Sequence, residues 1–308
     1  MKLTNFIQKG KFYKANLHAH STNSDGKLSQ EEAVSLYKDN GYNFLALSEH
    51  NRITQTDKYD TKDFKLVPAV ELHSYINNPL TIHHFVGLTT MDNKKVHDGM
   101  RLEDIPFTNN RESVLALEKR LTDLDFLTFY CHPTWSRVEL NQFDFISSNM
   151  MEIYNWGTIF SQAHNKDVTY WEDWNRLGKP IWGLANDDGH RIEQHLGGWN
   201  MIKCEEFTIE SMLESLKAGS FYATTGPEIH DFYVEDDIVH VKCSPASMVS
   251  IITMSKWGKC YRDPSASITE IEHEISSSAY LIRIEVHDRE GNIAWSNPII
   301  RPENLKYR

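Results

Sequence analysis

The segment that decides the fold begins at Phe12 and reads FYKANLHAHSTNSDGKLSQEEAVSLYKDNGYNFLAL. Its first residues, Phe12–His18, are predicted to form a strand, and its last four, FLAL, a strand buried on both faces. Between them, Ser29 and Glu32 have the spacing of a capping box, and Gly41 is typical of the position just past a helix end. The segment therefore predicts a strand–helix–strand unit with two histidines where the first strand ends.

The same alternation continues to about residue 225. Further strands are predicted at 66–72, 82–88, 126–130, 151–154 and 181–185, and helices at 111–124, 160–177 and 208–218. Strands that alternate with helices favour an α/β fold with a parallel sheet covered by helices. About seven such strands suit a closed, TIM-like (β/α) barrel, and an open doubly wound sheet is the alternative.

The pattern changes after Gly226-Pro227. Residues 280–286 alternate mostly between apolar and polar side chains, as a half-buried strand does, and 290–292 is a turn signal. Further strands are predicted at 239–241, 249–254, 271–275 and 293–295. We therefore predict two domains, residues 1–227 and residues 228–308, of which the second is a small antiparallel, β-sandwich-like domain.

Composition excludes several classes of protein. The 32 Lys and Arg residues against 43 Asp and Glu residues give a formal net charge of −11, which disfavours a protein that holds nucleic acid by charge alone. The four cysteines form no Cys-x-x-Cys pair, so neither a zinc ribbon nor a disulfide framework is predicted. No apolar run has the length of a signal peptide or a membrane span. We expect a cytoplasmic protein that acts on a small molecule, without a membrane or nucleic-acid partner.

Histidines and carboxylates gather at the predicted strand ends. His18 and His20 are two residues apart, and side chains with this spacing in a strand point the same way. At or just past later strand ends come Ser48-Glu49-His50, Glu71, His132-Pro133 and Asp187-Asp188-Gly189-His190, whereas His83-His84 lies within a strand. Sites in α/β folds are built at the carboxyl ends of parallel strands. The set therefore predicts a centre for divalent metal ions such as Zn, Mn or Fe.

Taken in order, these motifs resemble the PHP family, named for polymerase and histidinol phosphatase. The matching elements are His18 to Gly26 (HxHxxxxDG), Ser48-Glu49-His50, Ala69-Val70-Glu71, His84 to Leu88, His132-Pro133 and Asp187 to His190. They cover about residues 12–225, and the tail from Gly219 to Pro298 resembles the CehA/McbA-like branch of the family. The sequence departs from the family's pattern at Ala69, which stands for Gly, at Glu49, which stands for Asp, and at Asn51, which stands for an acidic residue.

The resemblance implies a distorted seven-stranded barrel with two or three metal ions in a cleft. One ion would be held by His18, His20, Glu71 and Asp188, a second by Glu71, His84 and His132, and a third by Asp25, His50 and His190. Glu71 and Asp188 are also the expected catalytic carboxylates. The spacing to Gly87 favours His84 over His83, and the D-x-H spacing favours Asp188 over Asp187.

This ligand chemistry suits a phosphoesterase that acts on a small phosphorylated substrate, such as a nucleotide or a sugar phosphate. Two cations can activate a water and neutralise phosphate oxygens. Arg137 and Arg191, close in sequence to His132 and His190, are the predicted phosphate clamps. Candidates for the general acid are the remaining nearby histidines, His73, His83 and His195.

Three alternatives stay open. A metal-dependent carboxylester or carbamate hydrolase of the CehA type keeps the metal site and has less need of an arginine clamp. A non-catalytic binding protein would act through the β domain. A proofreading exonuclease of the same family is disfavoured by the net charge of −11 and by the lack of a polymerase region.

Overall fold

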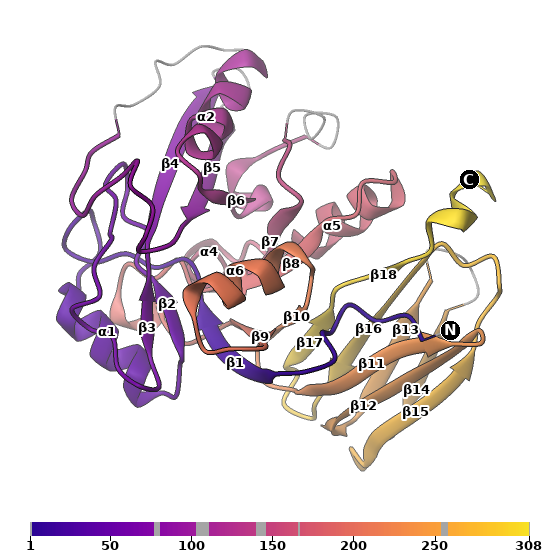
Figure 1. Cartoon of the computed structure of the whole chain (residues 1–308). Coiled ribbons are helices and arrows are strands. Elements are labelled where there is room, and N and C mark those ends of the chain that lie inside the picture. The colour runs from indigo at the N-terminus through magenta and orange to yellow at the C-terminus, as the bar shows by residue number, and fades with distance from the viewer. Residues whose placement is uncertain are drawn as a thin grey trace.

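The computed structural model describes residues 2–76, 81–102, 111–139, 146–165, 167–253 and 258–307. A mixed α/β body is followed by a strand-rich C-terminal part (Figure 1). The helices are α1 Gln30–Asp39, α2 Arg111–Asp123, α3 Pro133–Ser136, α4 Trp156–Gln162, α5 Asp167–Arg176 and α6 Ile209–Lys217, with short 3-10 turns η2 Ile192–Gln194 and η3 Pro302–Tyr307. Among the described residues, no helix is long and apolar enough to cross a membrane.

The strands form three sheets. A ten-stranded sheet has the order β14-β13-β16-β17-β10-β9-β1-β2-β3, with β18 paired to β16, a five-stranded sheet has the order β4-β5-β6-β7-β8, and a three-stranded sheet has the order β11-β12-β15. Their bounds are β1 Lys11–Asn16, β2 Phe44–Ala46, β3 Lys65–Val67, β4 Ala69–Ile76, β5 Thr81–Leu88, β6 Leu127–Tyr130, β7 Met150–Asn155, β8 Trp182–Asn186, β9 Trp199–Cys204, β10 Phe221–Thr224, β11 Ile229–Glu235, β12 Ile238–Ala246, β13 Met248–Ile252, β14 Lys259–Arg262, β15 Ile268–Glu274, β16 Leu281–His287, β17 Ile293–Ser296 and β18 Ile299–Ile300.

The α/β class is confirmed, but the prediction of a purely parallel sheet is wrong. Strands β1, β2 and β3 run parallel, as do β6, β7 and β8, whereas β4–β5, β5–β6, β1–β9 and β9–β10 are antiparallel pairs. Strand β4 ends at Ile76 and β5 begins at Thr81, and four residues cannot make the long crossover that parallel neighbours require. A closed seven-stranded barrel is not confirmed, because the strands belong to separate sheets.

Two further sequence predictions are corrected in detail. The predicted strand 66–72 is two strands, β3 and β4, separated at Pro68, whose nitrogen cannot donate to a ladder. The predicted helix 160–177 is also two elements. Helix α4 begins earlier, where the Asn155 side chain accepts from the amide of Thr158, and it ends at Ala163, which has a positive φ of 57°. The helix at 30–39 has the predicted capping box between Ser29 and Glu32.

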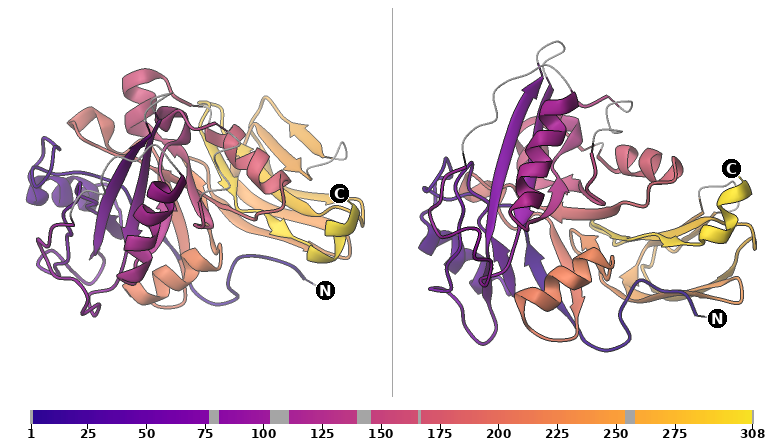
Figure 2. Two further views of the ribbon diagram at one scale, coloured as in Figure 1. Left: turned by 90° about the horizontal axis from the view of Figure 1, so that it is seen from above. Right: turned by 45° about the horizontal axis from the view of Figure 1, so that its top comes forward.

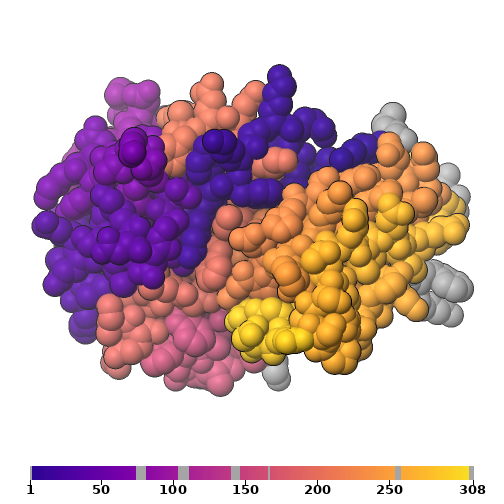
Figure 3. Space-filling view, turned by 90° about the horizontal axis from the view of Figure 1, so that it is seen from below, coloured from indigo at the N-terminus to yellow at the C-terminus, as the bar shows by residue number. Residues whose placement is uncertain are grey.

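The C-terminal part contains the strands predicted at 239–241, 249–254, 271–275, 280–286 and 293–295, as β12, β13, β15, β16 and β17, with shifted bounds. The sheet that carries β13 and the sheet that carries β12 pack their buried faces together, through residues such as Val241, Val249 and Ile284. Strand β17 pairs with β10, so one sheet continues from the α/β body into this part. The N-terminal segment also reaches it, because Leu3 bridges to Val234 and Phe6 joins the core (Figure 3). The division at residue 227 stays a prediction.

The apolar core fixes where the strand ends lie. Residues from both large sheets, including Leu17, Phe44, Val86, Phe129 and Leu184, form one fully buried cluster. Helix α2 lies along β4 and β5 and covers the five-stranded sheet (Figure 2). Two isolated parallel bridges join the two sheets: Ala19 to Gly189, just beyond the ends of β1 and β8, and His50, just beyond β2, to Glu71 near the start of β4. The two sheets therefore meet where the predicted ligands are.

Candidate metal centre

The structure brings all nine predicted metal ligands together. They come from the segments after β1, β2, β6 and β8, and from the strands β4 and β5. The four residues of the first predicted ion site, His18, His20, Glu71 and Asp188, each offer a ligand atom, and these atoms lie within 4.8 Å of one another. All four residues are buried.

Glu71 and Asp188 organise this first group. The Oε2 atom of Glu71 is 3.3 Å from His18 Nε2 and 3.2 Å from His20 Nε2. The Oδ1 atom of Asp188 is 3.2 Å and 3.1 Å from the same two nitrogens. Two imidazole nitrogens and two carboxylate oxygens therefore face one point.

The second group uses the other oxygen of Glu71. Its Oε1 atom is 2.6 Å from His84 Nδ1 and 3.9 Å from His132 Nε2. The Nε2 atom of His132 is also 3.8 Å from Asp188 Oδ2. Glu71 thus has one oxygen in each group, which is the arrangement that a bridging ligand needs.

The third group lies nearer to solvent. The Asp25 carboxylate, about half exposed, has Oδ1 3.3 Å from His190 Nε2 and Oδ2 3.7 Å from His50 Nε2. Ligand atoms of His20, Asp25, His50 and His190 again lie within 4.8 Å of one another. Gly26 closes this loop against the His20 carbonyl, because a Cβ at Gly26 would lie 2.6 Å from that oxygen.

Unpartnered buried atoms show that these residues fit a cation. Within the described chain, His18 Nε2, His20 Nε2, His50 Nδ1 and Glu71 Oε2 are buried and make no hydrogen bond. A buried polar atom without a partner costs about 1–3 kcal/mol. The four atoms converge, and imidazole nitrogen with carboxylate oxygen is a donor set for Zn, Mn or Fe. The residues therefore fit a divalent ion.

The charges and the burial of the cluster shift the pKa values of its carboxyls and histidines. Burial disfavours the charged forms of Asp188 and Glu71, but the surrounding histidines, His18 foremost, hold the pKa of both carboxyls well below the usual range. Burial also opposes the imidazolium of His20, yet the close Asp188 and Glu71 carboxylates raise its pKa to about 10. Burial lowers the pKa of His50 to about 3. Both carboxylates are thus ionised at neutral pH.

The raised pKa of His20 predicts that metal binding releases protons. In the metal-free protein His20 is protonated below about pH 10, and its charge stabilises the fold fully below pH 6.5 and progressively less as the pH rises towards 10. A metal must displace that proton, so zinc affinity is expected to rise by up to about tenfold per pH unit between pH 7 and 9. Calorimetric titrations with Zn²⁺ in two buffers of different protonation enthalpy measure the released protons. Equal apparent enthalpies in both buffers would contradict this expectation.

Residues next to the ligands have separate structural contacts. The Glu49 carboxylate accepts from Ser24 Oγ at 2.5 Å and from the Ser21 amide at 3.2 Å, and so holds the loop that follows His20. Asp187 accepts from Tyr37 Oη at 2.7 Å, and from the backbone amides of residues 196–198. His83 contacts Tyr130 Oη at 3.1 Å. The side chains of Asp187 and His83 therefore face away from the cluster that Asp188 and His84 join.

A cavity of about 510 Å³ opens onto the cluster. Besides candidate ligands, its described lining includes Trp135, His73 and the α4 face that carries Thr158, Ser161 and Gln162. His73 follows Glu71 by two residues in β4, and its ring centroid lies 5.5 Å from that of His84. Of the three general-acid candidates, His73 alone lines this cavity in the described structure, because His83 contacts Tyr130 and His195 contacts Tyr37.

The predicted arginine clamps are not among the described residues that line this cavity. Arg137 is exposed at the end of α3, and Arg191 is exposed just before η2. Among the described residues that line the cavity there is no Lys or Arg. The structure therefore does not bring either guanidinium group together with the nine ligands, and their role as phosphate clamps stays a prediction.

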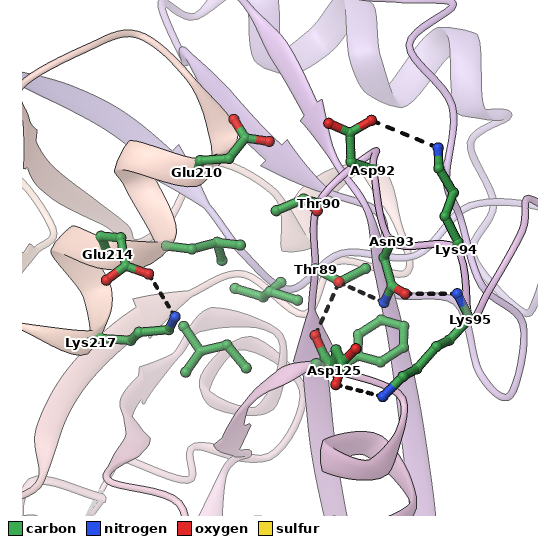
Figure 4. A pocket seen from close by; sticks show the side chains of 14 residues that line it. Thr89, Thr90, Asp92, Asn93, Lys94, Lys95, Asp125, Glu210, Glu214 and Lys217 are labelled. Atoms are coloured by element: carbon green, nitrogen blue, oxygen red, sulfur yellow. Dashed lines mark hydrogen bonds and ion pairs between the residues drawn. The ribbon is translucent and has the colours of Figure 1, made fainter.

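A larger cavity, about 720 Å³, has none of the nine candidate ligands in its described lining. Figure 4 shows this cavity from close by. It is bounded by α6 and by the segment after β5, and its lining contains no histidine among the described residues. Its lysines are engaged in ion pairs: Lys95 with Asp125 at 2.7 Å, Lys217 with Glu214 at 2.7 Å, and Lys94 with Asp92 at 3.8 Å. Size alone therefore does not identify the functional site, and ligand chemistry does.

Sequence reasoning missed two residues beside the ligands. Glu152, in β7, is fully buried and contacts His18, and Trp135 has its ring centroid 4.8 Å from that of His132. The sequence did contain an indication for Glu152, because an acidic residue inside the apolar run Met150–Ile153 must find buried partners. Trp135 follows the His132-Pro133 motif by two residues and had no comparable signal.

Comparisons with known proteins identify the fold. No family model matches the chain, and no curated protein matches it. A crystal structure of a two-domain protein containing a predicted PHP-like metal-dependent phosphoesterase, from Bacteroides vulgatus, matches over 96% of each chain with a TM-score of 0.50 and 12% identity. PsfC from Pseudomonas syringae matches at 0.45 and 11%, over 67% of this chain and 88% of its own. The lesion-specific endonuclease PfuEndoQ from Pyrococcus furiosus matches at 0.39 and 13%, over 66% and 55%. At these identities the first likeness shows a shared fold over nearly the whole chain.

Proposed function

We propose that the chain is a metal-dependent hydrolase, and that it is a phosphoesterase for a small phosphorylated substrate such as a nucleotide or a sugar phosphate. The observation that carries the proposal is the convergence of nine His, Asp and Glu residues, with four buried ligand atoms that make no hydrogen bond. The PHP resemblance of the motifs and the PHP-like name of the Bacteroides vulgatus protein support the same reading. Two or three ions would be held by the three ligand groups.

The chain's own residues define what the site does. Bound divalent cations would supply a water of lowered pKa and would neutralise oxygens of the scissile group. Glu71 and Asp188 are held ionised, so they can bind a cation or accept a hydrogen bond from water without first losing a proton. Trp135 and the α4 face line the same cavity, where Thr158 and Gln162 offer neutral hydrogen-bonding groups to the rest of the substrate. His73 lies on the same cavity and is the candidate to protonate the leaving oxygen.

A second function, a carboxylester or carbamate hydrolase, is favoured by one observation. The described lining of the cavity has no Lys or Arg, whereas a phosphate dianion is usually held by such cations. A neutral ester would need only the metal ions and the neutral wall of α4. A non-catalytic binding protein is the third candidate, and the complete ligand set counts against it.

Hydrolysis assays decide among these functions. The protein is incubated with an aryl phosphate and, separately, with an aryl ester, each before and after chelation and after re-addition of Mn²⁺ or Zn²⁺. Phosphate release that chelation abolishes supports the phosphoesterase, and ester cleavage alone supports the second function. Absence of both activities with metal restored would contradict the hydrolase.

Replacing the exposed arginines tests the predicted clamps. Arg137→Ala and Arg191→Ala are expected to leave metal content unchanged, because neither guanidinium group lies in the described cavity lining. A loss of phosphate hydrolysis with ester hydrolysis retained would assign the clamp to the substituted residue. A loss of metal in either variant would contradict the expectation.

The two large sheets could together form the predicted barrel. The bridges Ala19–Gly189 and His50–Glu71 would close a ring β1-β2-β4-β5-β6-β7-β8 around the metal centre, with the remaining strands outside it. We propose that this ring is the distorted seven-stranded barrel, and that residues 228–308 form a separate β domain.

A further inference from the structure

Glu152 is a carboxylate enclosed in the protein interior. It lies in the middle of β7, between Met151 and Ile153, and its side chain has no exposed surface. Within the described chain, its ion-pair partner is His18, not Lys or Arg. An isolated buried charge is strongly disfavoured unless hydrogen bonds compensate for the lost water. The partners of Glu152 therefore show what it is for.

Four donors surround the two oxygens of Glu152. Oε1 contacts His18 Nδ1 at 2.9 Å and accepts from Asn186 Nδ2 at 3.0 Å. Oε2 accepts from the His132 amide at 3.0 Å and from Asn155 Nδ2 at 2.8 Å. An ionised carboxylate only accepts, and it has about four lone-pair sites. All four lone-pair sites of the carboxylate are therefore used. Besides His18, the three partners are the His132 amide and the side-chain NH₂ groups of Asn155 and Asn186, which can only donate.

The contact with His18 fixes the state of its imidazole. Because Glu152 accepts, the hydrogen of His18 is held on Nδ1. The opposite nitrogen, Nε2, then faces Glu71 Oε2 and Asp188 Oδ1 without a hydrogen bond. A metal-ligating histidine commonly donates its second nitrogen to a carboxylate in this way, which sets the tautomer and the direction of the ring.

The second contact acts on the backbone of His132. This residue has a φ of 29° and a ψ of 63°, a conformation that is unfavourable for a residue with a Cβ. Its amide is held by Glu152 Oε2, and its Nε2 lies between Glu71 Oε1 and Asp188 Oδ2. Asn155 extends the same link, since its Nδ2 also lies 3.3 Å from Asp188 Oδ2.

We propose that Glu152 is a positioning residue of the metal centre, which holds His18 in its metal-binding tautomer and His132 in its strained backbone conformation. The proposal rests on the metal centre of the proposed function and adds to it a residue outside the nine ligands. Glu152 joins ligands from the segments that follow two different strands, β1 and β6, and from two of the three groups. Its removal should therefore weaken both.

Glutamine at position 152 is the sharpest test, because it keeps the shape and exchanges one acceptor for a donor. The backbone amide of His132 can only donate a hydrogen bond, so the glutamine oxygen must face it. The glutamine NH₂ group then faces His18 Nδ1, which must become an acceptor, and the hydrogen moves to Nε2. The nitrogen that faces Glu71 and Asp188 is then blocked. Glu152→Gln is expected to lower the affinity of the metal-free protein for Zn²⁺ by about 10–100-fold.

Two further variants separate position from charge and from folding. Glu152→Asp keeps the charge but is one methylene shorter, so it cannot reach both His18 and His132, and it should lose affinity as well. Glu118→Gln is the matched control, because Glu118 is also a buried carboxyl that accepts from a backbone amide, that of Ser147 at 2.8 Å, and touches no candidate ligand. It should keep the wild-type zinc affinity.

Calorimetric zinc titration and ¹⁵N NMR of the His18 imidazole are the measurements. The proposal expects a hydrogen on His18 Nδ1 in wild-type protein both with and without zinc, and no hydrogen on that nitrogen in folded Glu152→Gln. Wild-type zinc affinity in Glu152→Gln, or in Glu152→Asp, would overturn it, as would an unchanged His18 tautomer. None of these readouts needs hydrolysis, so a protein that binds zinc as expected but cleaves nothing would overturn the proposed function alone.

Discussion

Replacing Glu71 by glutamine is expected to remove metal from two of the three ligand groups and to abolish hydrolysis. Glu71 has Oε2 within 3.3 Å of His18 Nε2 and 3.1 Å of His50 Nδ1, and Oε1 within 2.6 Å of His84 Nδ1. An amide offers one neutral oxygen and one donor, and the donor would face imidazoles that should hold a cation. We expect the hydrolytic rate to fall by about 10³-fold or more, since each 1.36 kcal/mol of lost transition-state stabilisation is tenfold in rate.

Metal content and rate are measured on the same preparations of Glu71→Gln, wild type and Glu118→Gln. The control should resemble wild type in both, because Glu118 lies on α2 and contacts Ser147 and Thr128. A Glu71→Gln protein that keeps the wild-type number of ions would show that Glu71 is not a shared ligand. Loss of the rate with full metal retained would instead place Glu71 in the chemistry only.

Removal of metal is expected to destabilise the fold strongly. Without an ion, His18, His20, Glu71 and Asp188 are buried together with unpartnered atoms. A ligand present at 1,000 times its dissociation constant stabilises the native state by about 4 kcal/mol. Chelation should therefore lower the free energy of unfolding by about that amount, measured by thermal or denaturant unfolding with and without chelator.

The Glu71→Gln variant provides the control for this measurement. If the stabilisation comes from ions at the centre, chelator should lower the unfolding midpoint of wild type more than that of the variant, which has lost the ions that Glu71 helps to hold. An equal shift in both proteins would mean that the chelator acts at another place. No shift in either would contradict tight metal binding.

The placement of the ligands could be predicted because it depends on local sequence. A histidine or carboxylate just past an apolar run lies at a strand end, and the ends of neighbouring strands meet. This reasoning found His18, His50, His132 and Asp188 without knowledge of how the strands pair. The preferences for His84 over His83 and Asp188 over Asp187 depended on motif spacing.

The pairing of the strands was harder to predict, because it depends on what the loops permit. The sequence offered a clue at Asn77-Asn78-Pro79, since so short a connection indicates an antiparallel neighbour, and the regular alternation elsewhere obscured it. Strand β9 was missed because its buried face is formed by Asn200, Ile202 and Cys204. A buried Asn interrupts the apolar alternation, and its partners, including Ala185 and Asn186, come from β8.

The contacts that orient the ligands could not be predicted from single residues. Glu152 becomes meaningful only when β7 places it beside both His18 and the amide of His132. Likewise, the cavity wall formed by α4 depends on the break at Ala163, where a regular apolar pattern suggested one long helix. Such features follow from tertiary packing, which local periodicity does not contain.

The measurement that tests the central claim most directly is the metal content of the purified protein, determined by elemental mass spectrometry on protein prepared without chelator. The account predicts two or three divalent ions per chain in wild type, and a loss of at least two in Glu71→Gln. A wild-type protein that holds no ion, and that takes up none from added Zn²⁺ or Mn²⁺, would contradict it.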